Sequence, residues 1–371
     1  MVLADINRGS PTIAKILDST KMKLLLTAAL LASANAFHVP PKLSSNFRLS
    51  STAAQEDVGH LEVEAAPASE GWRSERVSLD ISKTIYTSSI KTPKDSYIAF
   101  AEKGAANAKM PKTKILHQSI LGGCYVGFGG LLSLSIAGGL GGIGAANPGI
   151  PKMAFAALFP VNLLLIVTTG GQLFTGNSAA VAAAKFEGLV EWRELFKSWT
   201  VSIIGNVIGC SLFALASWYI GLLTGGTAAL CSSTALNKCR STLGQTIVKA
   251  ILCNWMVSLA VFLAGAANDL SGKLVAVWFP ISTFVAIGLE HSVANMFIMP
   301  AALLLKVPLT VTDVLFRNVI PVLIGNAIAG ALVVSGSYSF QFGRLGKKKR
   351  EAFRKKLKEY EARKKAEKAK A

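Results

Sequence analysis

The fold is decided by the stretch Ala286-Ile-Gly-Leu-Glu-His-Ser-Val-Ala-Asn-Met-Phe-Ile-Met-Pro300, which lies inside one apolar segment at about residues 274–305. Glu290 and His291 stand midway through this segment, and Ser292 follows them. An ionisable side chain at the centre of a bilayer costs about 2.5–3.5 kcal/mol even on the lower scales. Such side chains usually face protein or water, so the stretch predicts a functional interruption in a membrane span.

The composition also indicates a membrane protein. Of 371 residues, 51% are hydrophobic and only 16% are charged, yet the formal net charge is +18. Residues 344–371 hold fourteen Lys or Arg and four Glu, so this tail supplies +10 of that charge. A basic tail directly after an apolar span indicates orientation and contact with anionic lipid rather than nucleic-acid binding.

Six apolar segments predict an all-α membrane protein. Each is long enough for a helix through a hydrocarbon core of about 30 Å. Only short hydrophilic stretches separate them, so we expect one transporter domain at residues 105–340 without a soluble insert. The predicted spans are residues 116–140, 153–183, 197–223, 245–267, 274–305 and 313–336.

The spans contain an internal repeat. The third contains Ile203-Ile-Gly-Asn-Val-Ile-Gly209, and the sixth contains Leu323-Ile-Gly-Asn-Ala-Ile-Ala-Gly330. The second and fifth are interrupted at residues 169–178 and 288–295. Because each half crosses three times, we predict two inverted three-helix repeats with broken second and fifth helices, an arrangement typical of transport proteins with a site near the midplane. We expect glycines to permit the turns at the breaks: Gly170, Gly171, Gly176 and Gly288.

Lys249 is the second informative ionisable residue, because it lies about one turn into the fourth span. A cation beside a pore would attract small anions. The alternative is that its long side chain reaches the headgroups. If Glu290 lies close to Lys249, the pair would neutralise each other and orient His291.

Three motifs resemble the formate/nitrite transporter family over about residues 105–340. They are Gln172-Leu-Phe-Thr-Gly-Asn177, Lys249-Ala-Ile-Leu-Cys-Asn254 and Gly288-Leu-Glu-His-Ser-Val-Ala-Asn-Met-Phe297. The resemblance implies a homopentamer of aquaporin-like protomers, each with its own pore. One departure is Gln172, where bacterial formate members often carry Glu.

The resemblance also implies the roles of particular residues. His291 would be the central pore residue, with Thr175 opposite it on a mobile first break, and Leu173 and Phe174 would help to form apolar constrictions. The other candidate pore residues are Asn177, Ser292 and Asn295, and the candidates for anion attraction and orientation are Lys249, Glu290 and Asn254.

We therefore predict transport of a small monovalent anion, nitrite or formate, linked to a proton through His291. Histidine suits this role because its ordinary pKa is near 6.5. The alternative for His291 is a neutral core histidine that only hydrogen-bonds Thr175 or Asn295. The expected partners are the anion, a proton and membrane lipid, with no cofactor, metal or nucleic acid.

Two other classes of protein fit less well. An aquaporin-like neutral-solute channel would carry paired Asn-Pro-Ala boxes at its breaks, and the sequence has none there. A membrane-embedded enzyme would need a catalytic set or a cluster of metal ligands, which the spans lack. Cys231 and Cys239 share the loop between the third and fourth spans, and whether they form a disulfide stays open.

The N-terminal residues read as targeting sequence. Residues 22–36 have a basic start, an apolar run and a small-residue end, as a signal peptide does. A Ser-rich basic stretch follows, so residues 1–55 resemble the two-part plastid leader of algae with complex plastids; secretion to the plasma membrane is the alternative. Residues 56–104 are predicted as a linker, with a short amphipathic helix at 96–108 lying on the membrane.

The short loops predict the orientation. Six crossings place both chain ends on one side, and that side carries most of the loop Lys and Arg, so we expect both ends in the cytoplasm or the stroma. The basic tail at residues 341–371 would face the same side.

Overall fold

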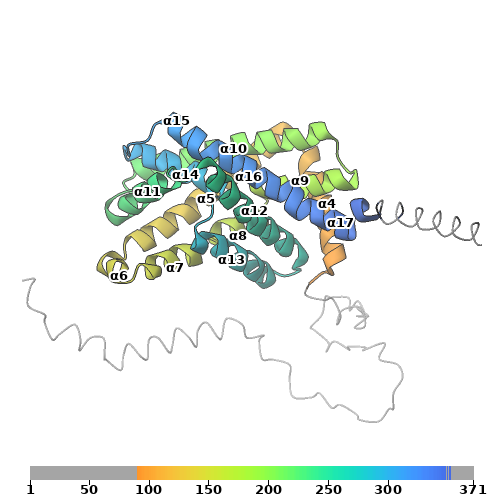
Figure 1. Ribbon diagram of the computed structural model, residues 1–371, viewed down its shortest axis with the longest axis horizontal. Helices are drawn as coiled ribbons and strands as arrows, with labels where there is room; N and C mark the ends of the chain where they lie inside the picture. Colours follow the sequence, from red (N-terminus) through yellow and green to blue (C-terminus); the bar gives the residue numbers. More distant parts are fainter. Residues whose placement is uncertain (1–89, 348, 350, 352–371) are drawn as a thin grey trace, which may run out of the picture. The chain divides into compact units, whose positions relative to one another are not determined.

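The computed structural model describes residues 90–347, 349 and 351, and within them six helices are apolar and long enough to cross a membrane (Figure 1). This confirms the predicted all-helical membrane fold with six spans. The spans are α5 (Lys112–Gly138), α7 with α8 (Gly149–Leu158 and Val161–Thr169), α10 (Trp192–Tyr219), α12 (Leu243–Ala266), α13 (Leu270–Ile287) and the run from α15 to α17 (Val311–Phe342). The predicted leader and linker at residues 1–89 and most of the tail lie outside the described residues.

Five shorter helices complete the described part. They are α4 (Pro93–Lys109), α6 (Gly141–Ala146), α9 (Phe174–Glu187), α11 (Gly225–Lys238) and α14 (Ser292–Leu304). The last span is one continuous rod that contains two π-helical stretches, η1 (Val314–Val319) and η2 (Ala329–Gly336), with α16 (Ile320–Ile328) between them. Such π-helical turns are uncommon and often occur at functional sites.

Two helices are broken as predicted. The second predicted segment is α8 followed by α9, and the fifth is α13 followed by α14. Gly170 ends α8 with φ 84°, and Gly288 ends α13 with φ 78°, left-handed conformations that favour glycine. The other two glycines predicted to turn the chain do not: Gly171 has no positive φ, and Gly176 lies inside α9.

Small residues let the repeated helix pairs approach closely. On α10, a Cβ at Gly209 would overlap the carbonyl oxygen of Ile120 on α5. On α16, a Cβ at Gly325 would stand 2.6 Å from the Cβ of Ala250 on α12. The two Gly-Asn strings of the sequence therefore make the same kind of contact in each half.

The amphipathic helix predicted before the first span packs its buried face against protein. Residues 96–108 do form a helix, α4, but it packs against α9 and α12. Tyr97, Phe100 and Ala108 are buried, and Gly104 has no room for a Cβ against the carbonyl group of Ala180. The side that looked amphipathic in the sequence is thus packed against protein.

The loop between the third and fourth spans contains α11, which the sequence did not predict. This helix packs against α5 and α14. Cys231 lies within it and Cys239 directly after it, and both are buried free thiols, so the disulfide left open by the sequence does not form.

We expect Gly209→Ala to destabilise the protein, because the added methyl group collides with backbone that cannot move aside. Overpacking of this kind typically costs about 1–3 kcal/mol. The matched control is Gly244→Ala, at an exposed helical glycine with open space around it, which should be neutral or slightly stabilising. Thermal unfolding in detergent measures both, and equal melting temperatures for the two variants would contradict the close packing.

Candidate functional site

Asn206 of α10 holds the first break in place. Its Oδ1 accepts the N–H of Phe174, the first residue of α9, at 2.9 Å. Its Nδ2 donates to the carbonyl oxygens of Ser119 at 2.8 Å and Gln172 at 2.9 Å. A break inside a membrane span exposes backbone groups that lipid cannot satisfy. This one buried amide satisfies two of them, at Gln172 and Phe174, and its third bond ties α10 to α5.

Asn326 of α16 holds the second break in the same way. Its Oδ1 accepts the N–H of Ser292, the first residue of α14, at 2.9 Å. Its Nδ2 donates to the carbonyl oxygens of Ala250 at 2.8 Å and Glu290 at 3.1 Å. The repeat predicted from the two Gly-Asn strings is therefore also a repeat of hydrogen bonds.

A second polar pair follows the same plan. Asn177 donates to Gln172 Oε1 at 2.8 Å, and Asn295 donates to Glu290 Oε2 at 2.7 Å. Each asparagine lies five residues after its acceptor, and each side chain therefore folds back across its own break. These bonds fix the polar side chain that precedes each half-helix.

His291 lies at the N-terminus of α14 and meets Thr175 in the first turn of α9. The His291 side chain is buried, and its Nδ1 accepts the N–H of Ala294 at 3.1 Å. Its Nε2 stands 3.1 Å from the hydroxyl oxygen of Thr175. Because Nδ1 accepts a backbone hydrogen bond, a neutral ring carries its proton on Nε2 and points that N–H at Thr175.

A cavity of about 490 Å³ opens on one side of His291. Lys152, Lys238 and Lys249 line it, and Glu290 is its only acidic lining residue. The aromatic rings of Phe159 and Phe284 also line it; their centroids are 6.3 Å apart, and that of Phe284 is 5.5 Å from that of His291.

Glu290 pairs with Lys238 rather than with Lys249, which corrects the pairing considered from the sequence. Lys238 Nζ stands 3.0 Å from Glu290 Oε2, which also accepts from Asn318 at 3.2 Å. Lys249 Nζ instead donates to Ser241 Oγ at 3.0 Å. Two of the three lysines in the cavity therefore have no carboxylate partner among the described residues.

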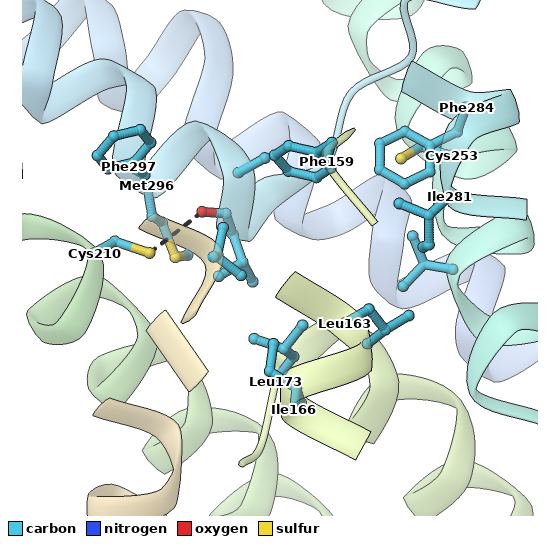
Figure 2. Packing of buried hydrophobic residues seen from close by; sticks show 14 of the residues in the cluster. Phe159, Leu163, Ile166, Leu173, Cys210, Cys253, Ile281, Phe284, Met296 and Phe297 are labelled. Atoms are coloured by element: carbon cyan, nitrogen blue, oxygen red, sulfur yellow. Dashed lines mark hydrogen bonds between the residues drawn. The ribbon is translucent and has the colours of Figure 1, made fainter. Parts of the chain in front are cut away.

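A smaller cavity of about 40 Å³ lies on the α9 side of the Thr175–His291 contact, and no residue lines both cavities. Its apolar lining includes Leu163, Ile166, Leu173 and Val261. Figure 2 shows Leu163, Ile166 and Leu173 gathered together, apart from the pair Phe159 and Phe284. Buried apolar side chains and the Thr175–His291 contact thus separate two openings in the protein.

The remaining predicted site residues have different surroundings. Asn177 lines the smaller cavity, although its side chain is engaged by Gln172 and Ser202. Phe174 lines neither cavity, because its ring packs edge-on against Trp199 with centroids 5.9 Å apart. Ser292, Asn295 and Asn254 also line neither cavity. Asn254 ties α12 to α9 and α16 by donating to Ser178 Oγ at 2.9 Å and to the carbonyl oxygen of Asn326 at 2.6 Å.

Sequence reasoning missed several lining residues. Lys238 read only as a loop cation, and nothing in the pattern distinguished Phe159 and Phe284 from other apolar residues of their spans. Asn318 was also missed, although an amide within an apolar run is a signal of a buried polar contact. Among the described residues, no three His, Cys, Asp or Glu side chains come together as metal ligands would.

Six spans, two opposed half-helices that meet at a buried Thr–His pair, and a cavity on each side define a membrane channel or transporter rather than an enzyme. A family model described as formate/nitrite transporter matches residues 94–340, and the chain belongs to that family.

Curated relatives agree with this membership. A probable formate transporter of Methanothermobacter thermautotrophicus is 38% identical over 273 residues, which cover 69% of this chain and 98% of the relative. A formate channel of Bacillus thuringiensis is 34% identical, with 64% of this chain and 90% of the relative covered. Formate-nitrite transporter 3 of Toxoplasma gondii is 32% identical, and the match covers 67% of this chain and 51% of that longer protein.

Two solved structures share the fold. One is described as an FNT family ion channel, with a TM-score of 0.62, 25% identity, and 67% of this chain and 98% of that chain covered. The other is a pentameric formate channel with formate bound, with a TM-score of 0.58, 25% identity, and 63% and 98% covered. The protein is therefore a multi-pass membrane protein of an anion transporter and channel family.

We expect Asn206→Ala and Asn326→Ala each to lower the melting temperature in detergent. Each change leaves a buried N–H and two carbonyl groups without their partner, at about 1–3 kcal/mol for each group left unsatisfied. Asn147→Ala, at an exposed asparagine between spans, is the matched control and should change little. Melting temperatures of the two anchor variants equal to that of the control would show that the anchors are dispensable.

Proposed function

We propose that the protein carries a small monovalent weak-acid anion, first of all formate, across the membrane together with one proton. The observation that carries this proposal is the position of His291, which presents Nε2 between a lysine-lined cavity and an apolar passage. The names of the relatives that transport or conduct formate support the choice of substrate. Nitrite, of similar size and charge, is the second substrate to test.

The lysines of the larger cavity attract the anion. Lys152, Lys238 and Lys249 face it, and Glu290 offsets one of their charges. A cleft lined by one sign of charge raises the local concentration of counter-ions and speeds their arrival. A channel for neutral solutes would gain nothing from such a lining, so the cavity favours the anion over the neutral-solute alternative.

The apolar side chains on both sides of the Thr175–His291 contact, which together form the apolar passage, are the barrier to a charged anion. Phe159 and Phe284 stand on one side of the Thr175–His291 contact, and Leu163, Ile166 and Leu173 stand on the other. Moving a bare anion into such surroundings loses its hydration without replacing it. A weak acid escapes most of this cost if it crosses in its protonated, neutral form.

His291 acts as a hydrogen-bond donor in this scheme. Its Nδ1 is occupied by the N–H of Ala294, so the ring takes a second proton only if that bond breaks. The neutral ring therefore offers Nε2–H to the incoming anion in place of Thr175, while the proton that crosses is taken up by the anion from the solution on the entry side. The structure thus favours protonation of the anion as it enters over full proton transfer from the imidazole.

We also propose a homopentamer and a location in the plastid envelope, with the plasma membrane as the alternative. The pentameric assembly of the formate-channel structure supports the first proposal, and native mass spectrometry tests it. The second rests on residues 1–55 of the sequence alone, and imaging of a fluorescent protein fused to those residues tests it. Both ends of the chain would then face the stroma.

His291→Phe should reduce pH-driven uptake of formate and nitrite into proteoliposomes by about 10-fold to 100-fold, because a hydrogen bond to a charged group is worth about 1.5–3 kcal/mol. Phe keeps a flat aromatic ring at this position but loses the Nδ1 acceptor of the Ala294 N–H, so gel filtration checks that the variant folds.

The matched control for this variant is His117→Phe, at an exposed histidine of α5 that lines neither cavity. This variant should transport as the unchanged protein does. Full uptake in a folded His291→Phe protein would remove the histidine from the mechanism.

A further inference from the structure

A third cavity, of about 230 Å³, lies where the start of α4 meets the corner between α12 and α13. Three lysines line it: Lys91 before α4, Lys103 on α4 and Lys273 in the first turn of α13. None of its lining residues is acidic. No part of the function proposed above uses this cavity.

Three hydrogen bonds hold Lys91 at the cavity wall. The Lys91 N–H donates to the carbonyl oxygen of Ala266 at 3.0 Å, and its Nζ donates to the carbonyl oxygen of Gly265 at 2.8 Å and to Asn268 Oδ1 at 3.0 Å. The chain just before α4 is thereby fastened to the end of α12. A lysine held by three such bonds has a fixed position at the cavity wall.

The other two lysines line the cavity without a carboxylate partner. Neither Lys103 nor Lys273 forms an ion pair within the described part of the chain. Glu102 precedes Lys103 on α4 but does not line the cavity. Asp269, four residues before Lys273, caps α13 by accepting the N–H of Gly272 at 2.7 Å. Loss of solvation in its surroundings, and then the charge of Lys273, hold the pKa of Lys103 below its ordinary value.

Uncompensated like charges around a cavity raise the energy of the folded protein, and a bound anion lowers it again. Three ammonium groups match an oxyanion with about two negative charges better than a monovalent anion, because each lysine then finds an acceptor. The cavity volume is large enough for a phosphate group with water around it.

Because of where this cavity lies, an anion bound in it would affect transport. Lys103 and Val167 line both this cavity and the smaller one that contains Leu173. An anion bound here would therefore lie in the path that leads from this side of the protein to the apolar passage. A phosphate group that still carries a charge after gaining one proton would not itself cross the apolar side chains.

We propose that Lys91, Lys103 and Lys273 form a binding site for a phosphate-type oxyanion, free or as the head of an anionic lipid, and that the bound anion blocks transport from this side. The binding part stands independently of the proposed function, whereas the blocking part rests on it.

Calorimetric titration of the full chain in dodecyl maltoside micelles, which contain no phosphate, tests binding with inorganic phosphate as the probe. Lys273→Gln should weaken binding by about tenfold or more, since it removes one charge-assisted hydrogen bond. Lys94→Gln is the charge control on α4 and should bind phosphate as the unchanged protein does. Absence of binding, or equal binding by Lys273→Gln, would overturn the site.

Transport and lipid measurements separate the remaining outcomes. Phosphate on both sides of proteoliposomes should inhibit formate uptake, and Lys273→Gln should need about tenfold more phosphate for the same inhibition. Phosphate binding that persists without formate uptake would support the site and contradict the proposed function. Loss of phosphate binding in nanodiscs of phosphatidic acid, but not in those of phosphatidylcholine, would identify the occupant as a lipid headgroup.

Discussion

The structure depends on how two interrupted helices satisfy their backbone in the middle of a membrane. Hydrocarbon offers no hydrogen bonds, so each break must find its partners within the protein. Asn206 and Asn326 supply them: each accepts the first N–H of its half-helix and donates to one carbonyl oxygen within the break, and its second donated bond goes to a neighbouring helix. These bonds fix where α9 and α14 begin, and they therefore bring Thr175 and His291 into contact.

The charged residues beside the Thr175–His291 contact have two different roles. Lys238, Asn295 and Asn318 all donate to Oε2 of Glu290, so this oxygen of a buried carboxylate has three donors directly before His291. Removing one partner of such a network leaves an uncompensated charge, which is costly. The network therefore stabilises the second break, while lysines outside it give the cavity its positive character.

The sequence predicted the six spans, both breaks and the repeat, because glycine and polar residues within apolar runs are strong local signals. The pairing of His291 with Thr175 came from the family motifs, since the two residues are far apart in sequence. The sequence did not predict that the apolar face of α4 packs on protein, because helices that pack on protein and helices that lie on lipid share the same pattern; its place at the membrane surface stays a prediction. Lys238 was overlooked because α11, rich in small and polar residues, did not read as a helix, and only its fold carries that lysine to Glu290.

The central claim is that the anion crosses as a neutral pair with one proton. Formate uptake into proteoliposomes can be measured with a potassium diffusion potential set by valinomycin and equal pH on both sides. If the anion crosses with one proton, the potential changes neither the rate nor the extent of uptake, and an imposed pH gradient drives accumulation. Accumulation driven by the potential alone, with a matching current, would show that the bare anion crosses and would contradict the account.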